Sequence, residues 1–110
     1  MDCIFCKIIA GEIPGKKLYE DDELLAFYDV HPQAPLHFLV IPKKHIPTIL
    51  EADAVLLGKL LAKAKELALG EGCEEKGARF VINCKEDGGQ TVDHLHVHVL
   101  GGRPLLWPPG

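Results

Sequence analysis

The chain has 110 residues, of which 47% are hydrophobic and 25% are charged, and its formal net charge is -4. This length and apolar content suit one globular domain over residues 1–110 and exclude two full domains. The acidic balance argues against a nucleic-acid polymer as the main partner, because a phosphate backbone requires a basic face. We see no secretion signal and no apolar run near the ~20 residues that cross a bilayer, so we expect a cytoplasmic protein with no membrane partner.

The predicted elements begin with a short helix and three strands. Apolar residues recur with helical spacing within residues 3–10, and Gly11 would end this helix. Residues 17–20 and 24–30 indicate two strands separated by an acidic turn. Residues 37–41 form a compact, partly β-branched apolar run, which predicts a buried third strand.

A long amphipathic helix and two more strands follow. Within residues 52–69 apolar side chains recur with helical periodicity, with mostly charged residues between them, and Gly70 supplies the stop. Residues 79–83 and 94–100 indicate two further strands, joined by a loop over residues 85–90. Strands before and after one long helix in the sequence, with hairpin-length connections, predict an α+β domain with a mainly antiparallel sheet of roughly five strands.

Three histidines alternate with aliphatic residues in the segment His94-Leu95-His96-Val97-His98. Alternate side chains of an extended strand share a face, so the three imidazoles should line one surface. Imidazole titrates near neutrality, and such a row suits nucleophilic attack, proton transfer or metal ligation. Two other interpretations stay open: a solvated polar face of an edge strand, and a catalytic metal site, since histidines two residues apart on a strand can reach one ion.

Two shorter patterns could contribute to a site. Residues 88–91 are Gly-Gly-Gln-Thr, whose backbone could approach a phosphate, although the pattern is more typical of an ordinary turn. Cys3 and Cys6 have the Cys-x-x-Cys spacing, which indicates either two metal ligands or two ordinary thiols on a short helix. Cys73 and Cys84 lack a partner at such a spacing, and we expect them to be unliganded thiols.

Several segments, in order along the chain, resemble the histidine triad family. They are Cys3-Ile4-Phe5-Cys6-Lys7-Ile8-Ile9, Ala26-Phe27-Tyr28-Asp29-Val30, Pro32-Gln33-Ala34-Pro35, His37-Phe38-Leu39-Val40-Ile41-Pro42-Lys43-Lys44-His45, the alternating histidine segment, Gly101-Gly102-Arg103 and Trp107-Pro108-Pro109-Gly110. The last two resemble the Hint branch in particular. The resemblance implies a homodimer with joined sheets, which binds purine nucleoside monophosphates. It also implies hydrolysis of purine nucleoside 5′-phosphoramidates, of the adenosine 5′-monophosphoramidase type, through a nucleotidyl-histidine.

The resemblance assigns roles to five residues around the reacting phosphate. His96 matches the nucleophile, which would split one hard displacement into two easier ones. His98 and His37 match residues that contact the phosphate. Thr91 stands where a serine is common in the branch, and its hydroxyl could donate a proton to the leaving amine. Asp29 matches the carboxylate that accepts hydrogen bonds from the ribose hydroxyls.

The other nucleotide-binding residues implied by the resemblance are polar groups near the phosphate and apolar walls for the base and sugar. The polar set is Asn83, Gly89, Gln90 and, through its backbone, Val92. The apolar set is Phe5, Phe27, Val30 and Leu39. A core role is as open as a binding role for the apolar residues. His31 matches no catalytic position, and we expect it on the surface.

Cys3 and Cys6, with His45 and His94, match the ligands of family members from bacteria that carry zinc. Tetrahedral zinc prefers such a set of thiolates and imidazoles, so the resemblance implies a closed structural site that fastens the first helix to the catalytic strand.

Two alternative functions stay open, and one further expectation concerns the end of the chain. The alternatives are a dinucleoside polyphosphate hydrolase of the same family and a nucleotide-binding interaction module whose turnover is incidental. Residues 104–110 contain three prolines, which rules out a helix or a central strand. In a homodimer we expect this tail, including Trp107, to lie near the neighbouring subunit's site.

Overall fold

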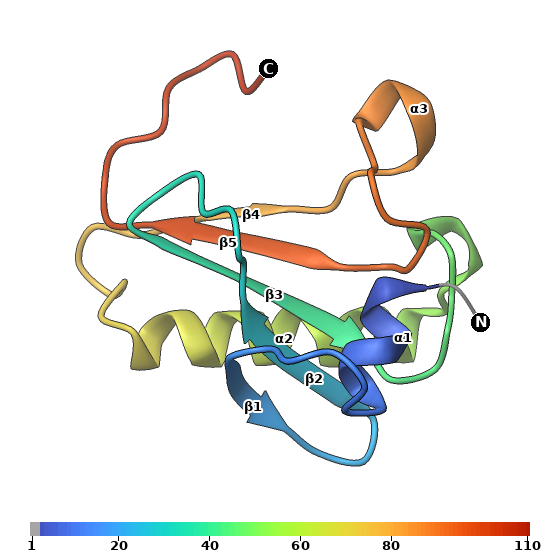
Figure 1. Ribbon diagram of the computed structural model, residues 1–110. Coiled ribbons are helices and arrows are strands. Elements are labelled where there is room, and N and C mark those ends of the chain that lie inside the picture. The colour runs from blue at the N-terminus through green and yellow to red at the C-terminus, as the bar shows by residue number, and fades with distance from the viewer. Residues whose placement is uncertain (1–2) are drawn as a thin grey trace.

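The computed structural model describes residues 3–110 and contains a five-stranded antiparallel sheet with the order β1-β2-β3-β5-β4 (Figure 1). The strands are β1 (Lys17–Glu20), β2 (Leu24–Tyr28), β3 (Leu36–Pro42), β4 (Arg79–Val81) and β5 (Val97–Gly101). The predicted α+β class with a mainly antiparallel sheet is confirmed.

Three α-helices accompany the sheet: α1 (Ile4–Ile9), α2 (Ala54–Gly70) and α3 (Lys85–Gly88). A single 3-10 turn, η1 (Ile49–Glu51), precedes α2. Asp53 begins α2 as its N-cap, because a side-chain oxygen accepts from the backbone N–H of Leu56 at 2.8 Å. Among the described residues, no helix combines the length and apolar content that a membrane span needs.

Helix α3 corrects the prediction of a loop over residues 85–90. Its single turn is held by Gln90, whose side-chain oxygen accepts from the backbone N–H of Lys85 at 2.9 Å. Lys85 itself has a φ of 56°, and Gly89 ends the turn with a φ of 75°. One turn shows no hydrophobic period, so the sequence pattern could not predict this helix.

The two helices α2 and α1 cover opposite faces of the sheet (Figure 1). On the α2 face, Phe38 of β3 packs with Leu60 of α2, and both are fully buried. On the α1 face, Phe5 packs against Phe27 with ring centroids 5.4 Å apart. Alternate side chains of β2 and β3 therefore point to opposite faces of the sheet and belong to two separate hydrophobic cores.

Strand β5 is an interior strand, and its start differs from the prediction of residues 94–100. The N–H of Leu95 donates to the carbonyl of Ile46 at 2.7 Å, which diverts this segment from the sheet until Val97. Alternation nevertheless persists, because Leu95 and Val97 belong to the core under α2. Since β5 lies between β3 and β4, the interpretation as a solvated edge strand is wrong. Strand β4 is also shorter than the predicted residues 79–83.

Candidate active site and metal centre

The sheet brings three of the predicted catalytic side chains together with one carboxylate. His37 of β3 and His98 of β5 meet across the strands, with His37 Nε2 2.9 Å from His98 Nδ1. Asp29, just after β2, places Oδ2 3.5 Å from the same Nε2. His96 continues the row, with its ring centroid 4.9 Å from that of His98. Neighbouring strands thus gather residues that are far apart along the chain.

The hydrogen bonds of His37 and His98 determine which ring nitrogen carries each proton. The backbone N–H of Gln33 donates to Nδ1 of His37 at 3.0 Å, so this nitrogen supplies a lone pair. A neutral His37 then carries its proton on Nε2 and donates it to Nδ1 of His98. His98 consequently carries its own proton on Nε2, where it can donate to a ligand.

His96 has the opposite tautomer. Its Nδ1 lies 2.7 Å from the carbonyl oxygen of His94, which can only accept, so Nδ1 carries the proton. The lone pair is therefore on Nε2. His96 is 4% exposed, and the ring of Phe5 packs edge-on against it with centroids 5.1 Å apart. This orientation leaves one well-held nucleophilic nitrogen on a ring that lies next to the ring of His98.

Burial keeps the three rings neutral near pH 7. Burial first, and then the neighbouring His96 and His37, lower the pKa of His98 to about 4, against a smaller opposing effect of Asp29. Burial also lowers the pKa of His96 and that of His37. Neutral rings preserve the alternating donors and acceptors described above.

Asp29, His37 and His98 also bring ligand-type atoms within 4.8 Å of one another. An ion at this position would need the Nε2 lone pair of His37, but the Gln33 N–H already uses the lone pair of Nδ1. A neutral imidazole cannot offer both, so this cluster suits a hydrogen-bond relay better than a metal. Among residues 3–110, no potential metal cluster unites all three histidines of the alternating row.

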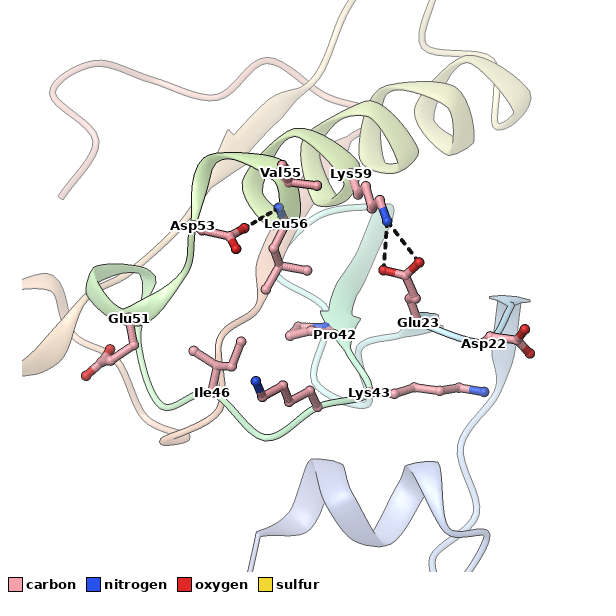
Figure 2. A pocket seen from close by; sticks show the side chains of 11 residues that line it. Asp22, Glu23, Pro42, Lys43, Ile46, Glu51, Asp53, Val55, Leu56 and Lys59 are labelled. Atoms are coloured by element: carbon pink, nitrogen blue, oxygen red, sulfur yellow. Dashed lines mark hydrogen bonds and ion pairs between the residues drawn. The ribbon is translucent and has the colours of Figure 1, made fainter.

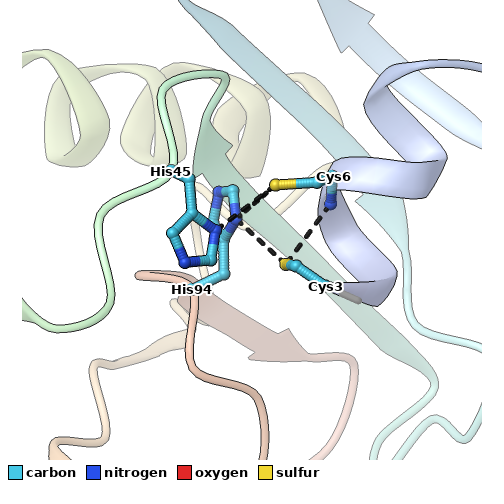
Figure 3. Close-up of side chains that lie close together, drawn as sticks. All are labelled: Cys3, Cys6, His45 and His94. Atoms are coloured by element: carbon cyan, nitrogen blue, oxygen red, sulfur yellow. Dashed lines mark hydrogen bonds between the residues drawn. The ribbon is translucent and has the colours of Figure 1, made fainter. Parts of the chain in front are cut away.

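A separate cluster joins Cys3, Cys6, His45 and His94, whose ligand atoms all lie within 4.8 Å of one another (Figure 3). Cys3 Sγ is 3.4 Å from His94 Nδ1, and Cys6 Sγ is 3.3 Å from His45 Nδ1. Figure 3 shows the side chains facing one another from α1, from the segment after β3 and from the segment before β5. The structure thus brings together all four predicted metal ligands.

The donor set fits zinc. Tetrahedral bonds of the usual lengths place sulfur and nitrogen ligands about 3.3–3.8 Å apart, close to the spacing seen here. Nε2 of His94 lies 2.8 Å from the carbonyl oxygen of Pro42, so Nε2 carries the proton and Nδ1 offers its lone pair to the cluster. Burial lowers the pKa of His94, which favours the neutral ring that a metal requires. Burial and the neighbouring Cys3 raise the pKa of the Cys6 thiol, a cost that a bound cation would offset.

The residues predicted as apolar walls are buried in a core, with one exception. Phe5, Phe27 and Leu39 belong to the core under α1, and Val92 packs against it. Val30 is instead 80% exposed. Three of the residues are thus structural, and Phe5 also contacts the ring of His96, whereas their role in binding a nucleotide stays a prediction.

Among the predicted polar residues, Gln90 has a structural role, and the others differ in how exposed they are. The Gln90 side chain donates to the carbonyls of Pro47, at 2.7 Å, and Val92, at 2.9 Å. It thereby ties the α3 turn to two other loops. Asn83 is half-buried, and Thr91 is exposed. Gly89 is the left-handed cap of α3, and His31 is exposed as expected.

A groove of about 420 Å³ lies between the end of β3 and the start of α2, away from the row of histidines (Figure 2). Two of its lysines have partners within the chain: Lys59 donates to both oxygens of Glu23 at 2.9 Å, and Lys43 pairs with Glu20 at 2.8 Å. No histidine or cysteine is among the described residues that line it. The groove therefore offers no nucleophile comparable to His96.

Two arginines near the histidines were not singled out by sequence reasoning. Arg79 donates through Nη2 to the carbonyls of Leu105, at 3.2 Å, and Leu106, at 2.9 Å. Arg103 donates through Nη2 to the carbonyl of Gln33 at 2.8 Å. Only Arg103 had a signal, since it belongs to the Gly-Gly-Arg segment.

Comparisons with known proteins show which family this sequence and fold resemble. A HIT domain model matches residues 10–105. An uncharacterized HIT-like protein of Synechococcus elongatus is 59% identical, over 99% of this chain and 97% of the relative. A HIT family hydrolase from Legionella pneumophila has a similar crystal structure, with 52% identity, a TM-score of 0.95, and coverage of 99% of this chain and 100% of that one.

A further similar crystal structure is that of a zinc-bound histidine triad family protein from Mycobacterium smegmatis. It is 32% identical with a TM-score of 0.86, over 94% of this chain and 76% of that chain. The match to the family model and the identity to the relatives extend over nearly the whole sequence, together with the fold and the row of histidines. The chain belongs to the HIT domain family.

Proposed function

We propose that this protein is a nucleotide-binding hydrolase of the Hint branch, which cleaves the P–N bond of purine nucleoside 5′-phosphoramidates. One observation carries the proposal: His96 keeps a neutral, unprotonated Nε2, and its ring lies 4.9 Å, centroid to centroid, from the ring of His98, whose Nε2 carries a proton. A nucleophile next to a hydrogen-bond donor is what attack on a phosphorus atom requires. The relatives described as HIT family hydrolases support a hydrolytic reaction.

In the first step, Nε2 of His96 attacks the α-phosphorus, and the P–N bond to the leaving amine breaks. The resulting nucleotidyl-imidazolium keeps its proton on Nδ1, where the carbonyl of His94 stabilises the positive charge. His98 donates to a phosphate oxygen, and His37 holds the ring of His98 in the required tautomer. The departing nitrogen needs a proton, for which the exposed hydroxyl of Thr91 is the proposed donor.

In the second step, water attacks the phosphorus from the side that the amine has left. The bond between phosphorus and Nε2 of His96 breaks, which releases the nucleoside monophosphate and restores the neutral ring. The proton lost by the water passes to solvent or to the group that protonated the amine. One difficult displacement is thereby replaced by two easier ones.

The nucleotide would be held by Asp29 and by the apolar side chains near His96. Asp29 Oδ1 accepts from the backbone N–H of His31 at 2.8 Å, which fixes the carboxylate. It would accept hydrogen bonds from the ribose hydroxyls. Phe5 and Leu39 would border the base and sugar, and residues 88–92 would supply polar groups near the phosphate.

Cys3, Cys6, His45 and His94 would hold a structural zinc ion. When bound, the metal would crosslink α1 to the segment before β5 and would take no part in the transfer of the phosphate. His94 contributes its side chain to this cluster and its carbonyl to His96. Rigid placement of residue 94 therefore helps to orient the nucleophile.

The test is turnover of an adenosine 5′-phosphoramidate by the His96→Ala variant. Loss of a covalent nucleophile should lower kcat by about 10⁴-fold, whereas binding of adenosine monophosphate should persist. His31→Ala is the matched control, because it removes an exposed imidazole and keeps the backbone N–H that bonds Asp29. Turnover within about tenfold of the wild type would contradict the assignment of His96.

A side-by-side assay with a dinucleoside polyphosphate distinguishes the alternatives. Faster hydrolysis of the polyphosphate would identify a dinucleoside polyphosphate hydrolase with the same nucleophile. Tight nucleotide binding with negligible hydrolysis of either compound would identify an interaction module.

We also propose a homodimer, since so small a domain gains stability from a second subunit. Light scattering at micromolar concentration tests this proposal.

A further inference from the structure

Cys3 and Cys6 lie on the same side of the first turn of α1. Cys3 is the N-cap of the helix, and its Sγ accepts from the backbone N–H of Cys6 at 3.4 Å. Both sulfur atoms lie close to Nδ1 of His94, at 3.4 Å and 3.6 Å, and within 4.8 Å of each other (Figure 3). Residues three apart in a helical turn have Cα atoms about 5–6 Å apart, a span that a disulfide can bridge. Rotation of the two side chains could therefore join the sulfur atoms without movement of a strand.

The two thiols are also accessible to a small reagent, because Cys3 and Cys6 are half-buried and neither is fully enclosed in the core. Cys73 and Cys84 are half-buried as well, but neither belongs to a cluster of potential metal ligands among residues 3–110. The chain therefore contains its own comparison for the reactivity of the pair in α1.

We propose that Cys3 and Cys6 are a redox-sensitive pair: a hydroperoxide converts the two thiols into a disulfide, which prevents the cluster from holding zinc, and a dithiol restores them. A metal binds the thiolate form of cysteine, whereas a disulfide sulfur is no longer a thiolate. His45 and His94 alone offer half of a tetrahedral set. The disulfide and the metal therefore exclude each other. This inference rests on the metal site of the proposed function and is independent of the proposed reaction.

The oxidation uses one molecule of hydrogen peroxide for each pair of thiols. The thiolate of one cysteine attacks a peroxide oxygen, the O–O bond breaks, and hydroxide leaves and takes up the proton of that thiol to form water. The sulfur becomes a sulfenic acid. The second thiol then attacks this sulfur, so that the S–S bond forms, the S–O bond breaks, and the hydroxyl leaves as water with the second thiol's proton. Two electrons pass from the sulfur atoms to the peroxide, and a dithiol returns them through a mixed disulfide.

The disulfide would replace a long-range crosslink with a local one. The metal cluster ties Cys3 to His94, 91 residues away in sequence, whereas the disulfide joins residues only three apart. A crosslink restricts the unfolded chain more when it closes a longer loop, so the exchange should lower the Tm by roughly 10 °C. Apolar contacts still hold α1, because Phe5 packs against Phe27 and His96 with centroids 5.4 Å and 5.1 Å away. We therefore expect oxidation to change thermal stability, while the chemistry of His96 persists at moderate temperature.

The experiment treats the reduced, zinc-loaded protein with hydrogen peroxide in the presence of a chromogenic zinc chelator, and a sample without peroxide corrects for zinc that the chelator removes by itself. Absorbance measures the zinc released, and the remaining thiols are alkylated and assigned by peptide mass spectrometry. About one zinc ion should appear for every two thiols lost, and the peptide that contains Cys3 and Cys6 should become lighter by two hydrogen atoms. Dithiothreitol should restore both thiols and the capacity to bind zinc.

Two variants separate this pair from the other thiols. Cys73→Ser with Cys84→Ser leaves only the thiols of Cys3 and Cys6, and it should keep the wild-type zinc release, thiol loss and recovery. Cys6→Ser removes the neighbouring thiol, so peroxide should form no disulfide within residues 3–6. A melting curve of each variant verifies that it is folded, and the double serine variant carries the test alone if Cys6→Ser does not fold.

Release of zinc by peroxide while Cys3 and Cys6 can still be alkylated would overturn the inference. Retention of zinc and of both thiols at a peroxide concentration that fully oxidises free dithiothreitol would also overturn it, and so would an oxidised protein with the Tm of the zinc-loaded form. Absence of zinc from the reduced protein would instead refute the proposed metal site on which the inference rests. The two failures are distinguishable, because the zinc content is measured before peroxide is added.

Discussion

Replacing His98 with glutamine should make the fold less sensitive to acid. Burial, and then the neighbouring His96 and His37, lower the pKa of His98 from 6.5 to about 4. The unfolded chain lacks this environment, so its His98 takes up a proton near the ordinary value. Between these two values the unfolded state binds more protons than the folded state. The free energy of unfolding therefore decreases as the pH falls.

The magnitude follows from the difference between the two pKa values. Protonation of His98 lowers the free energy of unfolding by about 3 kcal/mol once the pH is below both pKa values. About 2 kcal/mol of this loss has already occurred at about pH 5. Above the unfolded-state pKa the ring is neutral in both states, and the effect disappears. The neighbouring carboxylate of Asp29 opposes the shift only in part.

Urea unfolding followed by circular dichroism measures this effect at about pH 7 and about pH 5. Between these conditions His98→Gln should lose about 2 kcal/mol less stability than the wild type. His31→Gln is the matched control, since it removes an exposed histidine. Any release of metal by acid affects all three proteins and cancels in the comparison. Equal losses in the wild type and His98→Gln, or a control that behaves like His98→Gln, would refute the reasoning.

Three other predictions concern the metal, the loops and the tail. Cys3→Ser with Cys6→Ser should abolish binding of about one zinc per chain and lower the Tm, as metal analysis and calorimetry can measure; zinc-free protein purified without chelator would contradict this. Chelation of the wild type should lower the Tm while activity at moderate temperature persists. Gln90→Ala should reduce the free energy of unfolding by about 1–3 kcal/mol, because it leaves its main-chain partners without hydrogen bonds; an unchanged urea midpoint would disprove the role. Deletion of residues 104–110 should change relative rates among amines more than nucleotide affinity, which kinetics and calorimetric titration can compare.

Strong local periodicity was sufficient to predict the main elements of the fold. The helix predicted over residues 52–69 is α2, displaced slightly because Asp53 acts as its N-cap. The apolar run at residues 37–41 is the buried centre of β3. These elements bury side chains on faces that the sequence itself specifies, so their type follows from the pattern.

Weaker elements depended on distant contacts. Helix α3 is a single turn held by the Gln90 side chain, and its sequence shows no hydrophobic periodicity. The start of β5 is set by the hydrogen bond from Leu95 to Ile46, a residue about half the chain away. A hydrogen bond between such distant residues leaves no mark on local spacing, which is why both boundaries differ from the prediction.

The residue types of the site were visible in the sequence, whereas their chemical states were decided by tertiary structure. The row of histidines indicated a nucleophile or a metal site, and the resemblance named His96. An imidazole alone has two accessible tautomers, and only its partners select one. The carbonyl of His94 selects the Nδ1–H form of His96, and the N–H of Gln33 selects the Nε2–H form of His37.

The fold, and not the local sequence, also brought together site residues that are distant in the chain. Cys3 and His94 are 91 residues apart in sequence, yet their ligand atoms lie 3.4 Å apart. Arg79 and Arg103 acquire a shared groove only because β4 pairs with β5 and the chain turns at Gly102. The sequence alone determined which chemical groups were available. Their distances and their protonation depended on which strands became neighbours, because these properties arise from packing between segments that are distant in the chain.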